Sequence, residues 1–338
     1  MSNLIPRFVV TLLSVAACAA QPTIGSIDFF AHTGVDIDAL RSNLTIRPGN
    51  PWTSETNELV RLEIEELLGR APSDVDAVCC DEAGNRMIYI GLSGGSGSRD
   101  RWNPQPTEPI ELGTDLLTLY GRYEQAVEQA VSGGEGLILE DRSLGYPVSR
   151  DDGVREIQQR IRQYALSNSA QLFSVSRGSS LARHREIAVD AIGFGLHSAD
   201  QIDALTHSAL DPDRTVRNNA IRALSVLAAS EVELEAPIPY ATFVDLLSSE
   251  MRTDRSKAVF LLSELTESRD PGVLEAILRR ALAPLVECAR WSWSGHAYPA
   301  RVVLGRIGGI DEATILAEAR NSAFVDVALD AIQRSRTR

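Results

Sequence analysis

The chain has 338 residues, and its 46 Asp and Glu against 33 Lys and Arg leave a formal net charge of −13. This length suits two or three domains, and 44% apolar residues are enough to build their cores. The acidic balance argues against a nucleic acid partner, which clustered Lys and Arg would have to bind. Lys257 is the only lysine, which excludes a Walker A phosphate loop because that motif needs a lysine after its glycine.

The first twenty residues predict a targeting segment. An apolar run from Phe8 to Ala17 follows Arg7 and is too short to span a membrane, as in a secretory signal peptide over 1–20. The small residues around Cys18 fit cleavage by a signal peptidase, and Val15 to Cys18 also resembles a bacterial lipobox that would make Cys18 a lipidated first residue. Both alternatives place the protein outside the cytoplasm, in the periplasm or lipid-anchored in the envelope, with Cys18 as its only membrane contact.

The chain has three further cysteines, Cys79, Cys80 and Cys288. An odd number of cysteines cannot form a complete disulfide framework. Cys79 and Cys80 are adjacent on a predicted strand, so their side chains should point to opposite faces with one of them in the core. A vicinal disulfide, or a metal pair with Asp81 and Glu82, are the alternatives, and the sequence leaves the oxidation state open.

Residues 22–92 predict a small α+β module. The expected elements are a strand at Ile24–Phe30, helices at Ile37–Asn43 and Glu55–Leu68, and strands at Asp74–Cys80 and Arg86–Leu92. This β-α-α-β-β order, together with the turn at Arg47-Pro48-Gly49, resembles the POTRA domain of bacterial envelope proteins. The resemblance implies binding of a peptide or protein, often by strand addition at a sheet edge. A small capping module without its own partner is the alternative.

Residues 93–114 are rich in Gly, Ser and Pro and predict a linker. Gly91 to Gly95 matches the G-x-S-x-G pattern of serine hydrolases, but the motif requires a helix directly after the serine, and the residues that follow are glycines and prolines. We therefore reject a hydrolase site there. Residues 115–179 predict a helical region with an irregular segment.

Residues 180–338 repeat a small-apolar pattern. Five copies of Ala-x-x-Ala/Leu/Val-Leu/Ile begin with alanines at intervals of 32, 38, 42 and 28 residues; these are Ala188, Ala220, Ala258, Ala300 and Ala328. A further helix is predicted between successive copies, so each unit is a helix pair that must stack on its neighbours to bury its apolar face.

The unit from Leu210 to Leu224 contains an Asp-Pro turn followed by Val-Arg-x-x-Ala, and it resembles a HEAT repeat. Pro299 precedes Ala300, which leaves the unit boundary there open. The predicted fold is therefore mostly α, a HEAT-type α-solenoid preceded by a small α+β module. The resemblance implies a non-enzymatic scaffold of the cell envelope that binds a protein partner.

Six residues are the candidates for partner binding because Trp and Arg dominate binding hot spots. They are Arg214, Arg217, Asn218, Trp291, Trp293 and Arg301. Two alternatives stay open: a loop packed by its own Trp residues, and Arg side chains paired with local Asp. No cofactor, catalytic residue or metal site is predicted, since the five histidines lack metal spacing. The rival hypothesis is an envelope enzyme with its site near 143–150 or 291–301.

Overall fold

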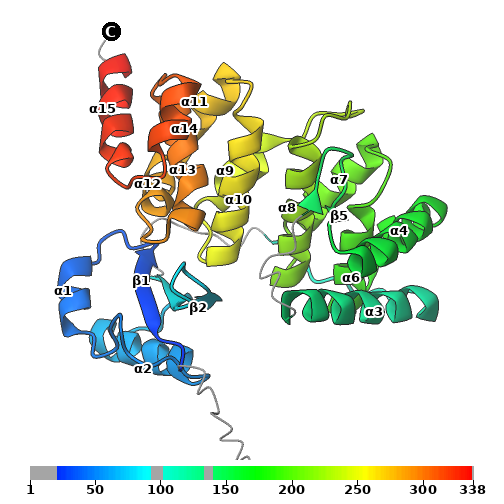
Figure 1. Cartoon of the computed structure of the whole chain (residues 1–338), viewed down its shortest axis with the longest axis horizontal. Coiled ribbons are helices and arrows are strands. Elements are labelled where there is room, and N and C mark those ends of the chain that lie inside the picture. Colours follow the sequence, from blue (N-terminus) through cyan, green and yellow to red (C-terminus); the bar gives the residue numbers. More distant parts are fainter. Residues whose placement is uncertain (1–20, 93–101, 133–139, 337–338) are drawn as a thin grey trace, which may run out of the picture.

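The computed structural model describes residues 21–92, 102–132 and 140–336 (Figure 1). The chain folds into a small sheet module at its N-terminal end and a long array of helix pairs that occupies the rest. This confirms the predicted fold class: mostly helical, with an α-solenoid preceded by a small α+β module.

The module has the predicted β-α-α-β-β order. Its elements are β1 (Ile24–Phe30), α1 (Ile37–Asn43), α2 (Thr56–Leu68), β2 (Asp74–Cys79) and β3 (Arg86–Gly91). The sheet order is β1-β3-β2, with β1 parallel and β2 antiparallel to the central β3. Both β1 and β2 are therefore edge strands.

The central strand β3 is buried on both faces. Alternate side chains point to opposite sides of a strand, so Ile88 and Ile90 pack with Val60 and Ile64 of α2 inside the module. Their neighbours Met87 and Tyr89 face the other way, into the core of the solenoid. β3 is apolar on both faces because one face packs in the core of the module and the other in the core of the solenoid.

The solenoid is built from two stacked layers of helices. The first helices of the pairs are α5 (Ser169–Gly178), α7 (Ala199–Ser208), α9 (Tyr240–Leu246), α11 (Pro271–Arg280) with α12 (Leu282–Ala289), and α14 (Glu312–Glu318). The second helices are α6 (Ala182–Ile192), α8 (Arg214–Ala228), α10 (Arg252–Leu265), α13 (Ser294–Ile307) and α15 (Phe324–Arg336). Each second helix packs against the next one, and the repeated alanines are fully buried where they do so.

The array starts earlier than 180, the expected boundary, because α5 packs against α6 and forms the first pair. It is preceded by α3 (Thr114–Ala130), the short strands β4 (Glu140–Asp141) and β5 (Val148–Ser149), and α4 (Asp152–Ser167). Pro299 lies buried inside α13, so this proline does not mark a unit boundary. Asp213 caps α8 by accepting hydrogen bonds from the backbone N–H groups of Thr215 and Val216, as the Asp-Pro turn predicts.

The described part of the predicted linker, 102–113, is packed against the solenoid. Trp102 lies over the guanidinium of Arg217 at 3.9 Å, and the backbone N–H of Asn103 donates to the Leu210 carbonyl at 2.7 Å. Further along, Glu108 bridges to Ser179, and the Leu112 N–H lies 2.9 Å from Nδ1 of His184. This stretch is therefore hydrogen-bonded to residues at or just before the starts of α6 and α8, and it does not act as a flexible linker. The rest of the predicted linker lies outside the described residues.

Candidate functional site

A ladder of three buried arginines connects the repeats. Arg185, Arg217 and Arg255 occupy the same position in successive units, three residues before the repeated alanine. They pair with Asp211 at 2.8 Å, Asp254 at 3.0 Å and Glu287 at 2.6 Å respectively. Each also donates a hydrogen bond to the carbonyl oxygen of the residue six positions earlier. We call these three residues the arginine ladder.

The ladder corrects the prediction that Arg217 faces a partner. Its side chain is 3% exposed, both oxygens of Asp254 accept its hydrogen bonds, and Trp102 covers its face. The alternative, pairing with an acidic residue of the same chain, is the one observed. The sequence did contain a signal for the ladder, since Arg-x-x-Ala recurs in three consecutive units.

The aromatic cluster at 291–298 lies under the sheet module. Trp291 is 1% exposed and contacts Tyr89 of β3 and Phe30 of β1 in edge-on geometry. The Tyr89 hydroxyl lies 2.8 Å from Nδ1 of His296, whose ring contacts Trp293 at 4.3 Å. We call the contact formed by Phe30, Tyr89, Trp291 and His296 the sheet–solenoid interface. It buries Trp291, so this side chain is not presented to a partner.

Burial controls the protonation of this interface. It lowers the pKa of His296 to about 3, assisted by the nearby positive charges of Arg252 and Lys257. Burial likewise raises the pKa of Tyr89 above its ordinary value. Both groups are therefore neutral at physiological pH, as a dry interface requires.

Polar contacts fix the position of the module on the solenoid. Asp28 accepts hydrogen bonds from the backbone and hydroxyl of Ser292 at 3.0 and 2.7 Å, and Asp76 pairs with Arg252 at 2.5 Å. Gly91 fits a close approach, because a Cβ there would lie 2.8 Å from the Phe30 ring and 2.9 Å from the Glu250 carbonyl. The module is thus built into the array at α10, α12 and α13.

The other predicted partner-binding residues are scattered. Arg301 is buried and donates to the Ala289 and Arg320 carbonyls, so it connects the ends of α12 and α14. Arg214 is 45% exposed and lies 3.8 Å from Asp76 of the module. Asn218 and Trp293 are half-buried. The structure therefore does not gather the six residues into one surface.

A different surface emerges from the repeat register. The residues one before and two after each repeated alanine lie three apart on their helix and so share a face. In α6 they are Ile187 and Asp190, in α8 Asn219 and Arg222, and in α10 Lys257 and Phe260. We call Asn219, Arg222, Lys257 and Phe260 the α8–α10 face. Sequence reasoning singled out Lys257 only as the sole lysine, and it did not use this register.

Exposure along this row rises from α6 to α10, falls at α13 and rises again at α15. Asp190 is 16% exposed, Arg222 29% and Phe260 38%, whereas the equivalent Val302 of α13 is 5% exposed. At the start of the row α3 covers α6, and further along the sheet module lies against α12 and α13 (Figure 1). Among α6, α8, α10 and α13 the row is most accessible at α10, and at the C-terminal helix α15 Val327 is 51% exposed.

A polar pocket of about 230 Å³ lies where α3 crosses α6 and α8. The Tyr120 hydroxyl donates to Asp190 at 2.9 Å, and Arg222 pairs with Glu140 at 2.6 Å. Burial raises the pKa of Asp190 despite the opposing charge of Arg222, and it raises the pKa of Tyr123 to about 12. The charged groups of this pocket are already paired with each other, so its geometry suits holding α3 in place.

A groove of about 590 Å³ runs beside the sheet–solenoid interface, between the module and α12. Its buried carboxylates are already engaged, since Asp28 accepts from Ser292 and Glu287 pairs with Arg255. These two carboxylates are therefore not free to bind a ligand in the groove.

The two regions of the enzyme hypothesis are occupied by packing contacts. In 143–150, Arg162 lies over the Tyr146 ring at 3.9 Å, and Gln158 accepts a hydrogen bond from the Ser149 N–H at 2.7 Å. In 291–301, Trp291 and His296 are part of the sheet–solenoid interface. Within residues 21–92, 102–132 and 140–336, no group of three or more His, Cys, Asp or Glu is arranged to hold a metal.

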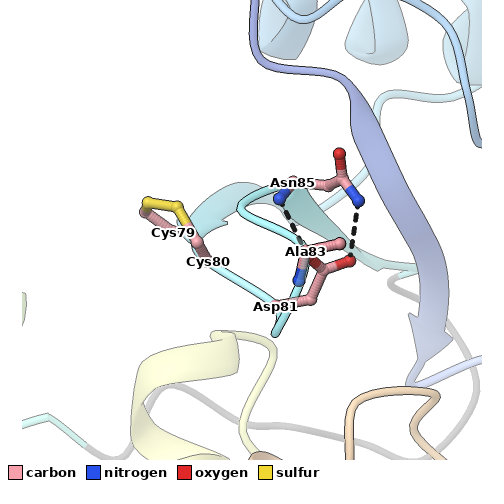
Figure 2. Close-up of a disulfide and its surroundings, with 5 residues drawn as sticks. All are labelled: Cys79, Cys80, Asp81, Ala83 and Asn85. Atoms are coloured by element: carbon pink, nitrogen blue, oxygen red, sulfur yellow. Dashed lines mark hydrogen bonds between the residues drawn. A yellow bond between two sulfur atoms is a disulfide. The ribbon is translucent and has the colours of Figure 1, made fainter.

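Cys79 and Cys80 form a vicinal disulfide at the end of β2 (Figure 2). Cys79 is exposed and Cys80 half-buried, so the prediction that one of them belongs to the core is wrong. The adjacent turn has its own hydrogen bonds, because Asp81 accepts from the N–H groups of Ala83 and Asn85. Cys288 is fully buried as a thiol in the solenoid core, and burial raises its pKa to about 12.

The targeting segment and Cys18 lie outside the described residues. Among the helices that the structure describes, none combines the length and the apolar character that crossing a membrane requires.

No protein-family model matches the chain, and no curated protein matches it. Similar solved structures are designed armadillo repeat proteins. One is 18% identical with a TM-score of 0.37, covering 54% of this chain and 95% of its own. Another, designed for modular peptide recognition, is 17% identical with a TM-score of 0.38, covering 61% and 98%. A third, solved with the peptide (KR)4, is 16% identical with a TM-score of 0.36, covering 53% and 93%.

Proposed function

We propose that the chain is a non-enzymatic scaffold protein of the bacterial cell envelope and that it binds a protein partner through the α8–α10 face. The observation that carries the proposal is the pattern of exposure along the second helices. Between α6, which α3 covers, and α13, where Val302 is buried, the chain leaves the row most open at α10, where an aromatic ring and a cation lie side by side.

The composition of this face suits recognition of another chain. Phe260 is a large apolar side chain that is 38% exposed, and the amide of Asn219 contacts only Asn218, at 3.5 Å, among the described residues. Exposed aromatic side chains such as Phe are enriched at protein interfaces relative to the rest of the surface. Asn218, which neighbours this face through its contact with Asn219, stays in the proposal, whereas the buried Arg217, Trp291 and Arg301 leave it.

The envelope location is part of the same proposal. It is supported by the apolar run Phe8 to Ala17 and by the Cys79–Cys80 disulfide, since disulfides persist in oxidising compartments. The POTRA-like resemblance of the module also belongs here. Its edge strand β2 is the element that would accept an added strand from a partner.

Site-specific photo-crosslinking in cells that make the protein tests the binding surface. A photoreactive amino acid replaces Phe260 in one variant and Leu316 in the other, because Leu316 is 57% exposed on a first helix, away from the α8–α10 face. We expect a discrete protein adduct from position 260 and none from position 316. Equal adducts from both positions, or none from position 260, would contradict the proposal.

A further inference from the structure

Lys257 is an unpaired cation in an acidic protein. It is half-buried on α10 and makes no hydrogen bond or ion pair within 4 Å among the residues that the structure describes. Its neighbour Arg142 is exposed and likewise has no carboxylate within that distance in the described chain. By contrast, Arg222 is paired with Glu140 and Arg252 with Asp76.

The electrostatic surroundings of Lys257 are net positive. Burial, together with the charges of Arg222, Arg252 and Arg142, lowers the pKa of Lys257 to about 8, and the charge of Glu140 opposes this shift. A half-buried ammonium surrounded by guanidinium groups is costly unless an anion joins it. The chain as a whole carries a net charge of −13, so this positive spot contrasts with the rest of the molecule.

Apolar surface lies directly beside the charge. Phe260 is three residues after Lys257 on α10, so both side chains share a face, and Asn219 holds the equivalent position to Lys257 on the neighbouring α8. An inorganic anion would use the cations alone. A peptide would use all three side chains, because the Asn219 amide can bond its backbone and the Phe260 ring can pack on an apolar side chain.

We propose that the α8–α10 face binds an acidic peptide segment, in which a carboxylate pairs with Lys257 and a neighbouring apolar side chain covers Phe260. The inference rests on the proposed function and adds the chemical class of the partner. The charge complementarity of Lys257 and Arg142 carries it, and the adjacent ring and amide distinguish a peptide from a free anion.

The test uses the full chain and a fluorescent hexapeptide of alternating Glu and Leu, with a Gln-Leu peptide as the neutral match. Anisotropy should show binding of the Glu-Leu peptide only, weakening as salt is added. Lys257→Met should reduce affinity at least tenfold and Phe260→Ser at least threefold, while Lys257→Arg keeps most of it. Arg279→Met, which removes an exposed cation from α11, should leave affinity unchanged.

The single lysine gives a second readout. An amine-reactive acylating reagent can label only Lys257 and the α-amino group, so mass spectrometry of the tryptic peptides reports the accessibility of Lys257 directly. The Glu-Leu peptide should slow acylation of Lys257 severalfold and leave the α-amino group unaffected. Lys257 should react faster at pH 8 than an ordinary lysine, as its lowered pKa requires.

Three outcomes would overturn the inference. Equal binding of the Glu-Leu and Gln-Leu peptides would show that charge does not select the ligand. Protection of Lys257 by inorganic phosphate, with no effect of Phe260→Ser, would show a site for a free anion only. A discrete crosslink from position 260 with no binding of the Glu-Leu peptide would refute the acidic partner and leave the scaffold function standing, whereas loss of both would refute the scaffold function too.

Discussion

The second-helix layer has two regions that use the same residue types for different purposes. At α10 to α13, aromatic and charged side chains are buried under the sheet module, where Trp291 packs on Tyr89 and Arg252 pairs with Asp76. On the α8–α10 face, by contrast, Phe260 is exposed and Lys257 is half-buried. An aromatic residue beside an arginine therefore marks a binding surface only when the rest of the chain leaves it uncovered.

Breaking the arginine ladder should lower the free energy of unfolding of the array and leave the α8–α10 face unchanged. Arg217→Met leaves Asp254 buried and unpaired, and removal of one partner of a buried ion pair costs about 3–5 kcal/mol. Urea unfolding should show this loss. Arg214→Met, three residues earlier and 45% exposed, is the matched control, for which we expect a change below about 1 kcal/mol. A stable Arg217→Met protein that fails to bind its partner would reverse our assignment.

Acid should weaken the sheet–solenoid interface through His296. Its pKa is about 3 in the folded chain against 6.5 as the ordinary value, so below pH 6.5 the unfolded chain takes up a proton that the folded chain does not. The free energy of unfolding should therefore fall by about 2 kcal/mol between pH 7 and 5 from this group.

The control for that prediction is His296→Gln, which keeps a hydrogen-bonding group beside Tyr89 and does not titrate. Asp28 and Asp74 also line the interface with raised pKa values, and each contributes stability in the opposite direction as the pH falls. Both groups are present in both proteins, so the difference between the two pH profiles isolates His296. Parallel profiles would contradict the prediction.

Removing the charge of Lys257 should stabilise the fold. Its pKa of about 8 lies below the ordinary 10.5, so the lysine reduces stability below pH 10.5, and this cost is complete below pH 8. Because the side chain is only half-buried, we expect Lys257→Met to gain about 1 kcal/mol at pH 7. The gain should vanish above pH 10.5 in unfolding experiments. A loss of stability at pH 7 would mean that Lys257 serves the fold and not a ligand.

The vicinal disulfide should matter least to stability. Cys79 and Cys80 are adjacent, so their bond closes a minimal loop and restricts the unfolded chain very little. The double variant Cys79→Ser, Cys80→Ser should lose less than about 1 kcal/mol, measured by thermal unfolding beside the parent. A larger loss would show that the hairpin depends on the bond in addition to the Asp81 hydrogen bonds.

The sequence predicts the elements well, because they depend on local patterns. An alternating run predicts β1 and a β-rich run predicts β3, and the repeated alanines predict α6, α8, α10, α13 and α15. The Asp-Pro turn correctly predicts the cap of α8, since an N-cap involves residues only two or three positions apart.

The site residues were harder to predict because their environment depends on distant parts of the chain. Arg217 is buried by Asp254, 37 residues away, and Trp291 by the strands of a module more than 200 residues earlier. Neither partner is implied by the local pattern around the residue. Lys257 and Phe260 become candidates only once the stacking of the helices shows which face each unit exposes and which parts α3 and the module cover.

The central claim is that the α8–α10 face, and Lys257 in particular, binds the partner. The most direct measurement is the yield of the crosslinked adduct from position 260 in the Lys257→Met background, compared with the Arg279→Met background in the same cells. Our account predicts at least a fivefold lower yield with Lys257→Met and an unchanged yield with Arg279→Met. Equal yields in the two backgrounds would contradict it.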